Sequence, residues 1–216
     1  MGDRKRRVSP RLADKKLPVT LPDIALNHGR VLWVLQELGY RGKTSPSTFY
    51  EYIKSLRKFG IPFRPGEIGL ARRGRANYSY FHIMELALAL TLRVYHAVPD
   101  SVLAQIIRYR RPLYRHFRRA YTERCNGLGT QIKIHADTSS SFALSGVFLD
   151  LQINFSGGGL VSFGPPKILS PADALQAFAA RDLAARAFLP INLSQLAERV
   201  IGLALIAPSP RPSEPP

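Results

Sequence analysis

Apolar residues recur at helical spacing through the first half of the chain. This spacing predicts four helices, over residues 24–38, 46–59, 80–95 and 101–110. Gly39 and Gly60 are typical helix stops, and Ser45 followed by Pro46 is a typical start for the second helix. The third helix is apolar on most sides, so we expect it at the centre of the core.

The segment between the second and third helices has a different composition. Residues 61–76 are rich in proline, glycine and arginine, which excludes a helix there. Short stretches at 61–63 and 68–71 predict a small β-hairpin with arginines at its tip or edge. Such a hairpin after a helix pair is what a DNA-contacting wing requires.

Strand-like patterns follow residue 129. Residues 131–136 alternate, and the odd positions from 147 to 155 are apolar with polar residues opposite, which is typical of a half-buried strand. Glycines 157–159 predict a turn into 160–163, so we expect a three-stranded antiparallel meander.

Two helices are expected after the strands. Ser170 and Pro171 begin an Ala-rich helix expected to reach about residue 188, and a last helix is expected over 192–207. Residues 208–216 form a Pro/Ser tail with nothing to build a core.

The basic charge is segregated along the chain. Of 216 residues with a formal charge of +16, residues 1–124 hold 25 of the 31 Lys and Arg and 9 of the 15 Asp and Glu, whereas residues 125–216 hold six of each. A segregated excess indicates a surface for a polyanion, although a solvated basic face is the alternative. The basic part has no long helix with one apolar and one Lys/Arg face, which favours nucleic acid over a bilayer.

Residues 31–110 resemble the MerR-type winged helix-turn-helix DNA-binding domain. The residues that carry the resemblance are Ser47-Thr48-Phe49-Tyr50-Glu51-Tyr52, Phe59-Gly60-Ile61-Pro62, Asn77-Tyr78-Ser79 with Ile83 and Leu86, and Val98-Pro99-Asp100-Ser101. The resemblance implies base-reading groups on the second helix, namely Ser47, Thr48, Tyr50 and Lys54. It also implies wing arginines on phosphates or in the minor groove. The basic residues expected at phosphates or the minor groove are Arg41, Lys43, Arg57, Lys58, Arg64, Arg72, Arg73, Arg75, Arg108, Arg110 and Arg111.

Catalytic and metal chemistry finds little support in the sequence. The five histidines show no metal-ligand spacing, and Cys125 is the single cysteine, which excludes a disulfide within the chain. We expect no enzymatic activity, no metal and no cofactor. No run approaches about 18 apolar residues, so we expect no membrane span and a cytoplasmic, nucleoid-associated protein.

The sequence therefore predicts an α+β protein in four parts. These are a flexible basic arm (1–23), a mostly helical winged helix-turn-helix domain with a small β wing (24–124), a small α+β domain with the meander and two helices (125–207), and a disordered tail (208–216). We expect a sequence-specific double-stranded DNA-binding protein, a transcription regulator that forms a homodimer through 125–207. That part could instead sense a small effector or bind another protein. The alternative function is a general RNA- or DNA-coating component of a larger assembly.

Overall fold

The structure is a computed structural model. It describes residues 23–63, 67, 77–107, 109–125, 132–135, 141–144, 148–150, 152–156, 160–163, 167–179, 186–188 and 191–208. The predictions for the basic arm up to residue 22, the strand at 68–71, the turn at 157–159 and the tail from 209 lie outside this part of the chain.

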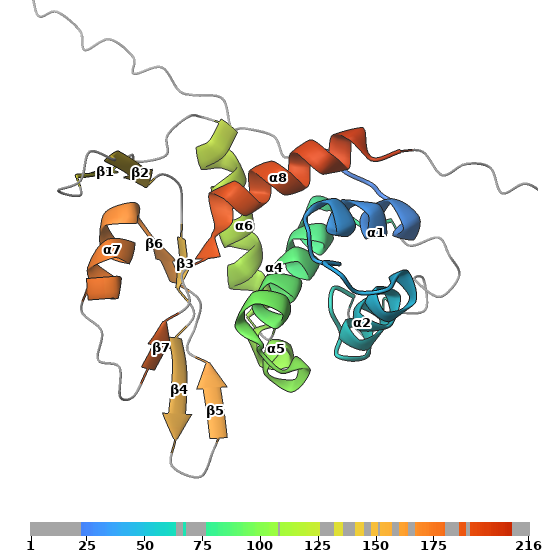
Figure 1. Ribbon diagram of the computed structural model, residues 1–216, viewed down its shortest axis with the longest axis horizontal. Helices are drawn as coiled ribbons and strands as arrows, with labels where there is room; N and C mark the ends of the chain where they lie inside the picture. The colour runs from blue at the N-terminus through green and yellow to red at the C-terminus, as the bar shows by residue number, and fades with distance from the viewer. Residues whose placement is uncertain are drawn as a thin grey trace, which may run out of the picture.

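Helices dominate an α+β fold, as the sequence predicts (Figure 1). The helices are α1 (His28–Glu37), α2 (Pro46–Lys58), α4 (Tyr80–His96), α5 (Asp100–Ile107), α6 (Arg110–Cys125), α7 (Pro171–Ala179) and α8 (Leu193–Ile206). The strands are β1 (Ile132–His135), β2 (Ser141–Leu144), β3 (Phe148–Asp150), β4 (Gln152–Ser156), β5 (Leu160–Phe163), β6 (Lys167–Leu169), β7 (Arg186–Phe188) and β8 (Ile191–Asn192).

Local residues fix the ends of α1 and α2. The side chain of Asn27 accepts from the Arg30 amide at the start of α1, and Ser45 accepts from the Thr48 amide at the start of α2. Both helices end at a glycine with positive φ, +93° at Gly39 and +79° at Gly60. At each glycine two backbone amides close back on the last turn of the helix, the arrangement that glycine favours at a helix C-terminus.

Helix α4 is the centre of the core. Every residue from 83 to 90 is buried, which confirms the prediction from its apolar sides. Figure 1 shows α4 between α2 and α6, with α1 and α8 nearby. Buried side chains from α1, α2, α5, α6 and α8 join α4 in one hydrophobic cluster.

The C-terminal helix α8 belongs to this same core. Leu193, Val200 and Ala204 are buried in it, so the core crosses the domain boundary expected near residue 125. Arginines join α8 to α1 at both ends. Arg30 donates to the Ala207 carbonyl (2.7 Å), and Arg199 donates to the Leu38 carbonyl (3.2 Å).

The strands do not form the expected meander. β1 pairs with β2 and β4 pairs with β5, but the described strands fall into three small antiparallel sheets, β1-β2, β6-β3-β8 and β5-β4-β7. The alternating run at 147–155 is divided, because β3 pairs with β6 and β8 while β4 pairs with β5 and β7. Alternation shows which face a residue occupies but not which strand lies beside it.

Two further local predictions were wrong. The segment expected to continue α7 to about residue 188 contains β7, because pairing with β4 overrides the helical preference of an Ala-rich stretch. Residues 61–63 form a bend rather than a strand, with a cis bond between Ile61 and Pro62. Ile61 and Phe63 are buried against the helical core, so this end of the expected wing is a packing segment.

Candidate nucleic-acid interface

Helix α2 presents a polar outer face on an apolar base. Phe49, Ile53 and Leu56 are buried, which confirms the predicted inward stripe. The outward side carries exposed side chains at helical spacing, namely Ser47, Tyr50, Glu51, Lys54 and Lys58. Three of the four predicted base-reading residues therefore share this face, while Thr48 is exposed beside it.

The hydroxyls at the start of α2 are held by the helix cap. Ser45 Oγ lies 3.0 Å from Ser47 Oγ and 2.9 Å from Thr48 Oγ1, and it also accepts from the Thr48 amide. The two predicted base-reading hydroxyls are therefore oriented by Ser45 at an exposed helix end, with lone pairs still available to a partner.

A carboxylate lies among the predicted base-reading groups. Lys54 Nζ is 3.0 Å from Glu51 Oε1, and the two side chains are 53% and 60% exposed. An exposed pair of this kind is weak, about 0–1 kcal/mol, so Lys54 can leave Glu51 for a stronger acceptor.

Tyr50 lies against a half-buried cluster between α1 and α2. Its ring meets the His28 ring edge-on, with centroids 5.7 Å apart. Arg57 donates to His28 Nδ1 (2.7 Å) and to the Tyr78 hydroxyl. Burial, and then the charge of Arg57, lower the pKa of His28 to about 4, so the ring is neutral at pH 7. Arg57, predicted to contact phosphate, therefore serves inside the protein as a support behind Tyr50.

The turn between α1 and α2 carries two of the predicted phosphate contacts. Arg41 Nε donates to the Thr44 carbonyl at 3.0 Å, which closes the turn. Gly42 has a φ of +54°, and Lys43 beside it is exposed. Lys43 is thus directed to solvent at the entrance to α2, while Arg41 is half-buried.

Arg110 is not available for the predicted phosphate contact. It is 9% exposed, and its guanidinium donates to both carboxylate oxygens of the fully buried Glu85, at 2.8 and 2.5 Å. Tyr114 donates to the same carboxylate. Burial raises the pKa of Glu85, and the hydrogen bonds from Arg110 oppose that shift. The helix register of α6 turns Arg110 inward, where a buried carboxylate requires a partner.

The outer side of α6 carries a row of three arginines. Of these, only Arg111 was among the residues predicted to contact phosphate. Arg111, Arg115 and Arg118 are exposed at i, i+4 and i+7, and we call them the α6 arginine row. Within the described chain none of the three forms an ion pair, and Arg118 lies over the Phe81 ring at 6.0 Å. The i, i+4, i+7 spacing of these arginines in the sequence could have shown that they share one face of the helix.

The aromatic residues of α6 face the protein instead. Phe117 is buried, Tyr114 stacks on Phe81 with centroids 4.8 Å apart, and Tyr121 packs near Tyr80 at 5.9 Å. They do not form a stacking platform for nucleic-acid bases. Arginines and aromatics are interleaved over residues 110–121 of the sequence, because α6 has one charged side and one packed side.

A hydrogen bond joins the chain just after α2 to the first residue of α6. Arg110 donates to the Gly60 carbonyl at 2.6 Å, which fixes the start of α6 against the end of α2. Lys58 and Arg111 are both exposed next to this junction. The other predicted phosphate residues, Arg64, Arg72, Arg73, Arg75 and Arg108, lie outside the described chain.

The described part of the chain contains no group of three His, Cys, Asp or Glu that could hold a metal ion. Among its helices, none has the length and apolar character needed to cross a bilayer. Comparisons with protein-family models, curated proteins and solved structures found no significant match.

Proposed function

We propose that this protein binds double-stranded DNA with α2 in the major groove, as the MerR-type resemblance implies. The observation that carries the proposal is the outer face of α2, where Tyr50 and Lys54 project from a helix capped at both ends and packed along its inner side. A rigid helix with hydroxyl, phenol and ammonium groups in one row can reach base edges in a groove that admits an α-helix.

The charge of the surrounding surface supports the same function. Lys43 and Lys58 flank the α2 face, and the α6 arginine row adds three exposed cations beyond the junction with α6. Such cations neutralise phosphates and supply affinity without sequence preference. Discrimination between sequences then rests on α2.

We further propose that the protein acts as a transcription regulator and as a homodimer, because two linked copies would bind paired half-sites far more tightly than one. Light scattering of the full chain tests the dimer. A strictly monomeric mass at the concentrations that bind DNA would contradict it.

The decisive experiment measures sequence preference. Duplexes enriched from a random pool by the full chain are compared with scrambled versions at several salt concentrations. Lys54→Ala and Tyr50→Ala should each lower the ratio of specific to scrambled affinity by about tenfold, the value of roughly one base contact. Lys167→Ala, an exposed cation on β6, is the matched control and should leave the ratio unchanged.

Equal affinity of the unaltered protein for enriched and scrambled duplexes would overturn sequence-specific binding. It would favour the general coating function, in which the α6 arginine row and other cations bind any polyphosphate. Because the α6 aromatics pack inward, coating of nucleic acid along the α6 arginine row would depend on charge rather than on base stacking.

A further inference from the structure

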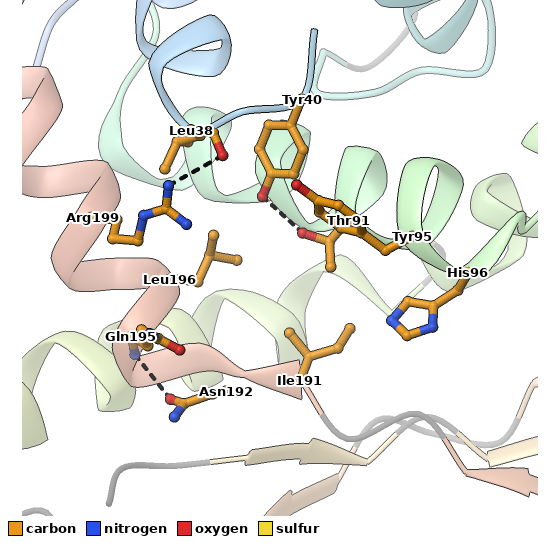
Figure 2. Close-up of a pocket in the computed structure, with 10 residues that line it drawn as sticks. All are labelled: Leu38, Tyr40, Thr91, Tyr95, His96, Ile191, Asn192, Gln195, Leu196 and Arg199. Atoms are coloured by element: carbon orange, nitrogen blue, oxygen red, sulfur yellow. Dashed lines mark hydrogen bonds between the residues drawn. The ribbon is translucent and has the colours of Figure 1, made fainter. Parts of the chain in front are cut away.

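A pocket lies apart from the α2 and α6 faces, where three distant segments meet (Figure 2). They are the end of α1 with the residues after it, the last turns of α4, and the start of α8 with β8. The pocket has a volume of about 220 Å³, or about seven water molecules at ~30 Å³ each. This space suits a small organic molecule rather than a single ion or a polymer.

The inner wall of the pocket is apolar and firmly packed. Leu38, Ile191 and Leu196 line it and are each less than a tenth exposed, so the wall is formed by the core itself. Such a wall is complementary to the hydrocarbon or ring portion of a ligand, because it removes apolar surface from water on contact.

Neutral hydroxyls lie at one side of the pocket. Tyr40 is 5% exposed, and burial raises its pKa to about 12. Its hydroxyl lies 2.7 Å from Thr91 Oγ1, and Thr91 in turn donates to the Ala87 carbonyl. Tyr40 is therefore the donor to Thr91. Tyr95 is 60% exposed, with its ring centroid 6.1 Å from that of Tyr40, and it extends this side toward solvent.

One side chain in the pocket lining carries a permanent positive charge. Arg199 on α8 donates one hydrogen bond to the Leu38 carbonyl, and within the described chain this is the single hydrogen bond of its guanidinium. Its remaining N–H groups are left for a partner. His96 lines the same pocket, and none of the described lining residues carries a carboxylate. The first turn of α8 adds little, because Asn192 already accepts from the Gln195 amide there.

We propose that this pocket binds a small organic carboxylate, with Arg199 holding the carboxylate group and Leu196 and Ile191 covering the apolar body. A guanidinium pairs with a carboxylate through two parallel hydrogen bonds, which fixes the ligand in one orientation. Tyr40 immediately precedes the turn that carries Lys43 into α2, so the bound ligand would lie beside the segment that leads to the proposed DNA-contacting helix.

The test uses the full chain without DNA, so its outcome is independent of the proposed function. Benzoate is titrated by calorimetry, with benzyl alcohol as a neutral analogue of similar size. Benzoate should bind saturably with a Kd of about 1 mM or tighter, and benzyl alcohol should bind about tenfold more weakly or worse. No saturation by benzoate up to about 10 mM, or equal binding of the alcohol, would overturn the proposal.

Variants locate the binding in this pocket. Arg199→Gln should weaken benzoate binding by about tenfold, whereas Arg111→Gln, an exposed arginine on α6, should not change it. Because Arg199→Gln also removes the bond to Leu38, Tyr95→Ala serves as a second variant that truncates a mostly exposed side chain. It should weaken binding while leaving the thermal unfolding temperature unchanged. Benzoate binding that is the same in all three variants would place the ligand elsewhere and contradict the proposal.

Discussion

The outer faces of α2 and α6 are both exposed and basic, yet they differ in chemistry. The α2 face mixes hydroxyl, phenol and ammonium groups with the carboxylate of Glu51, whereas the α6 row consists of arginines at successive turns. Donors and acceptors in a mixed set can distinguish one base edge from another. A row of like charges is attracted to any phosphate chain. In the proposed complex with DNA, the α2 face would supply selectivity and the α6 arginine row would supply affinity.

In both helices an arginine is used inside the protein rather than on the surface. On the last turn of α2, Arg57 bonds to His28 and Tyr78, and at the start of α6, Arg110 bonds to Glu85 and to the Gly60 carbonyl. Both were expected to contact phosphate. Net charge therefore overstates the cations available to a ligand, because some arginines satisfy polar groups within the protein.

The largest expected effect is on the free energy of unfolding, and it distinguishes the buried Arg110 from the exposed Arg111. Glu85→Ala leaves the buried Arg110 without its carboxylate, which should lower the free energy of unfolding by about 3–5 kcal/mol. Arg111→Ala removes an exposed side chain and should change it by less than about 0.5 kcal/mol. Urea denaturation measures both. A loss below about 1 kcal/mol for Glu85→Ala would show that the ion pair does not hold α6 in place.

The next effect concerns affinity. Replacing Arg111, Arg115 and Arg118 together by Ala removes three expected phosphate contacts, so the slope of log K against log salt should become shallower by about 2.7. The ratio of enriched to scrambled duplex affinity should stay the same, because no base contact is lost. DNA titrations at several salt concentrations measure both quantities.

Lys167→Ala is the control for the loss of a single charge, since Lys167 is exposed on β6, outside both helices. An unchanged salt slope in the triple variant would remove α6 from the interface. A fall in the specificity ratio instead would mean that the arginine row contacts bases, which would end the proposed division between the two faces.

Sequence reasoning succeeded where the determinants were local. Ser45, Pro46 and Gly60 define the ends of α2 through contacts within a few residues, and the position of α4 follows from its apolar sides. Sequence reasoning failed where a side chain bonds to a residue far away along the chain. Glu85 is 25 residues from Arg110, and nothing near Arg110 signals that a buried carboxylate requires it.

The same limit applies to the strands and to the C-terminal helix. The register of β3 and β4 with their neighbours depends on segments up to several tens of residues away, so alternation alone could not assign the sheets. The amphipathic pattern of α8 predicted its existence and bounds but not that it covers α1, α4 and α6. The core that α8 shares with α1, α4 and α6 therefore joins segments from both sides of residue 125.

A smaller effect is expected on the pH dependence of stability, through His28, whose ring contacts Tyr50. The pKa of His28 is lowered from 6.5 to about 4, so between these values the unfolded chain binds the proton and the folded protein does not. Stability from this site is present above about pH 6.5 and is lost as the pH falls toward 4. We expect His28→Phe to make the free energy of unfolding less dependent on pH over this range, as measured by denaturation at several pH values.

His96→Phe is the matched control, because His96 is exposed at the end of α4. Burial also lowers the pKa of His82, so part of the pH dependence should remain in the His28 variant. If His28→Phe and His96→Phe gave the same pH profile as the unaltered protein, the neutral His28 would not be a support of α2.

The smallest effect lies within the α2 face itself. Glu51→Gln removes a carboxylate that pairs with Lys54 and repels phosphate, so duplex affinity should rise by about threefold at low salt. Stability should change by less than about 0.5 kcal/mol, because the pair is exposed. Glu37→Gln, an exposed acid at the end of α1, gives the same change in net charge away from this face. If both variants raised affinity equally, Glu51 would act only through the overall charge, and the mixed chemistry of the α2 face would not explain selectivity.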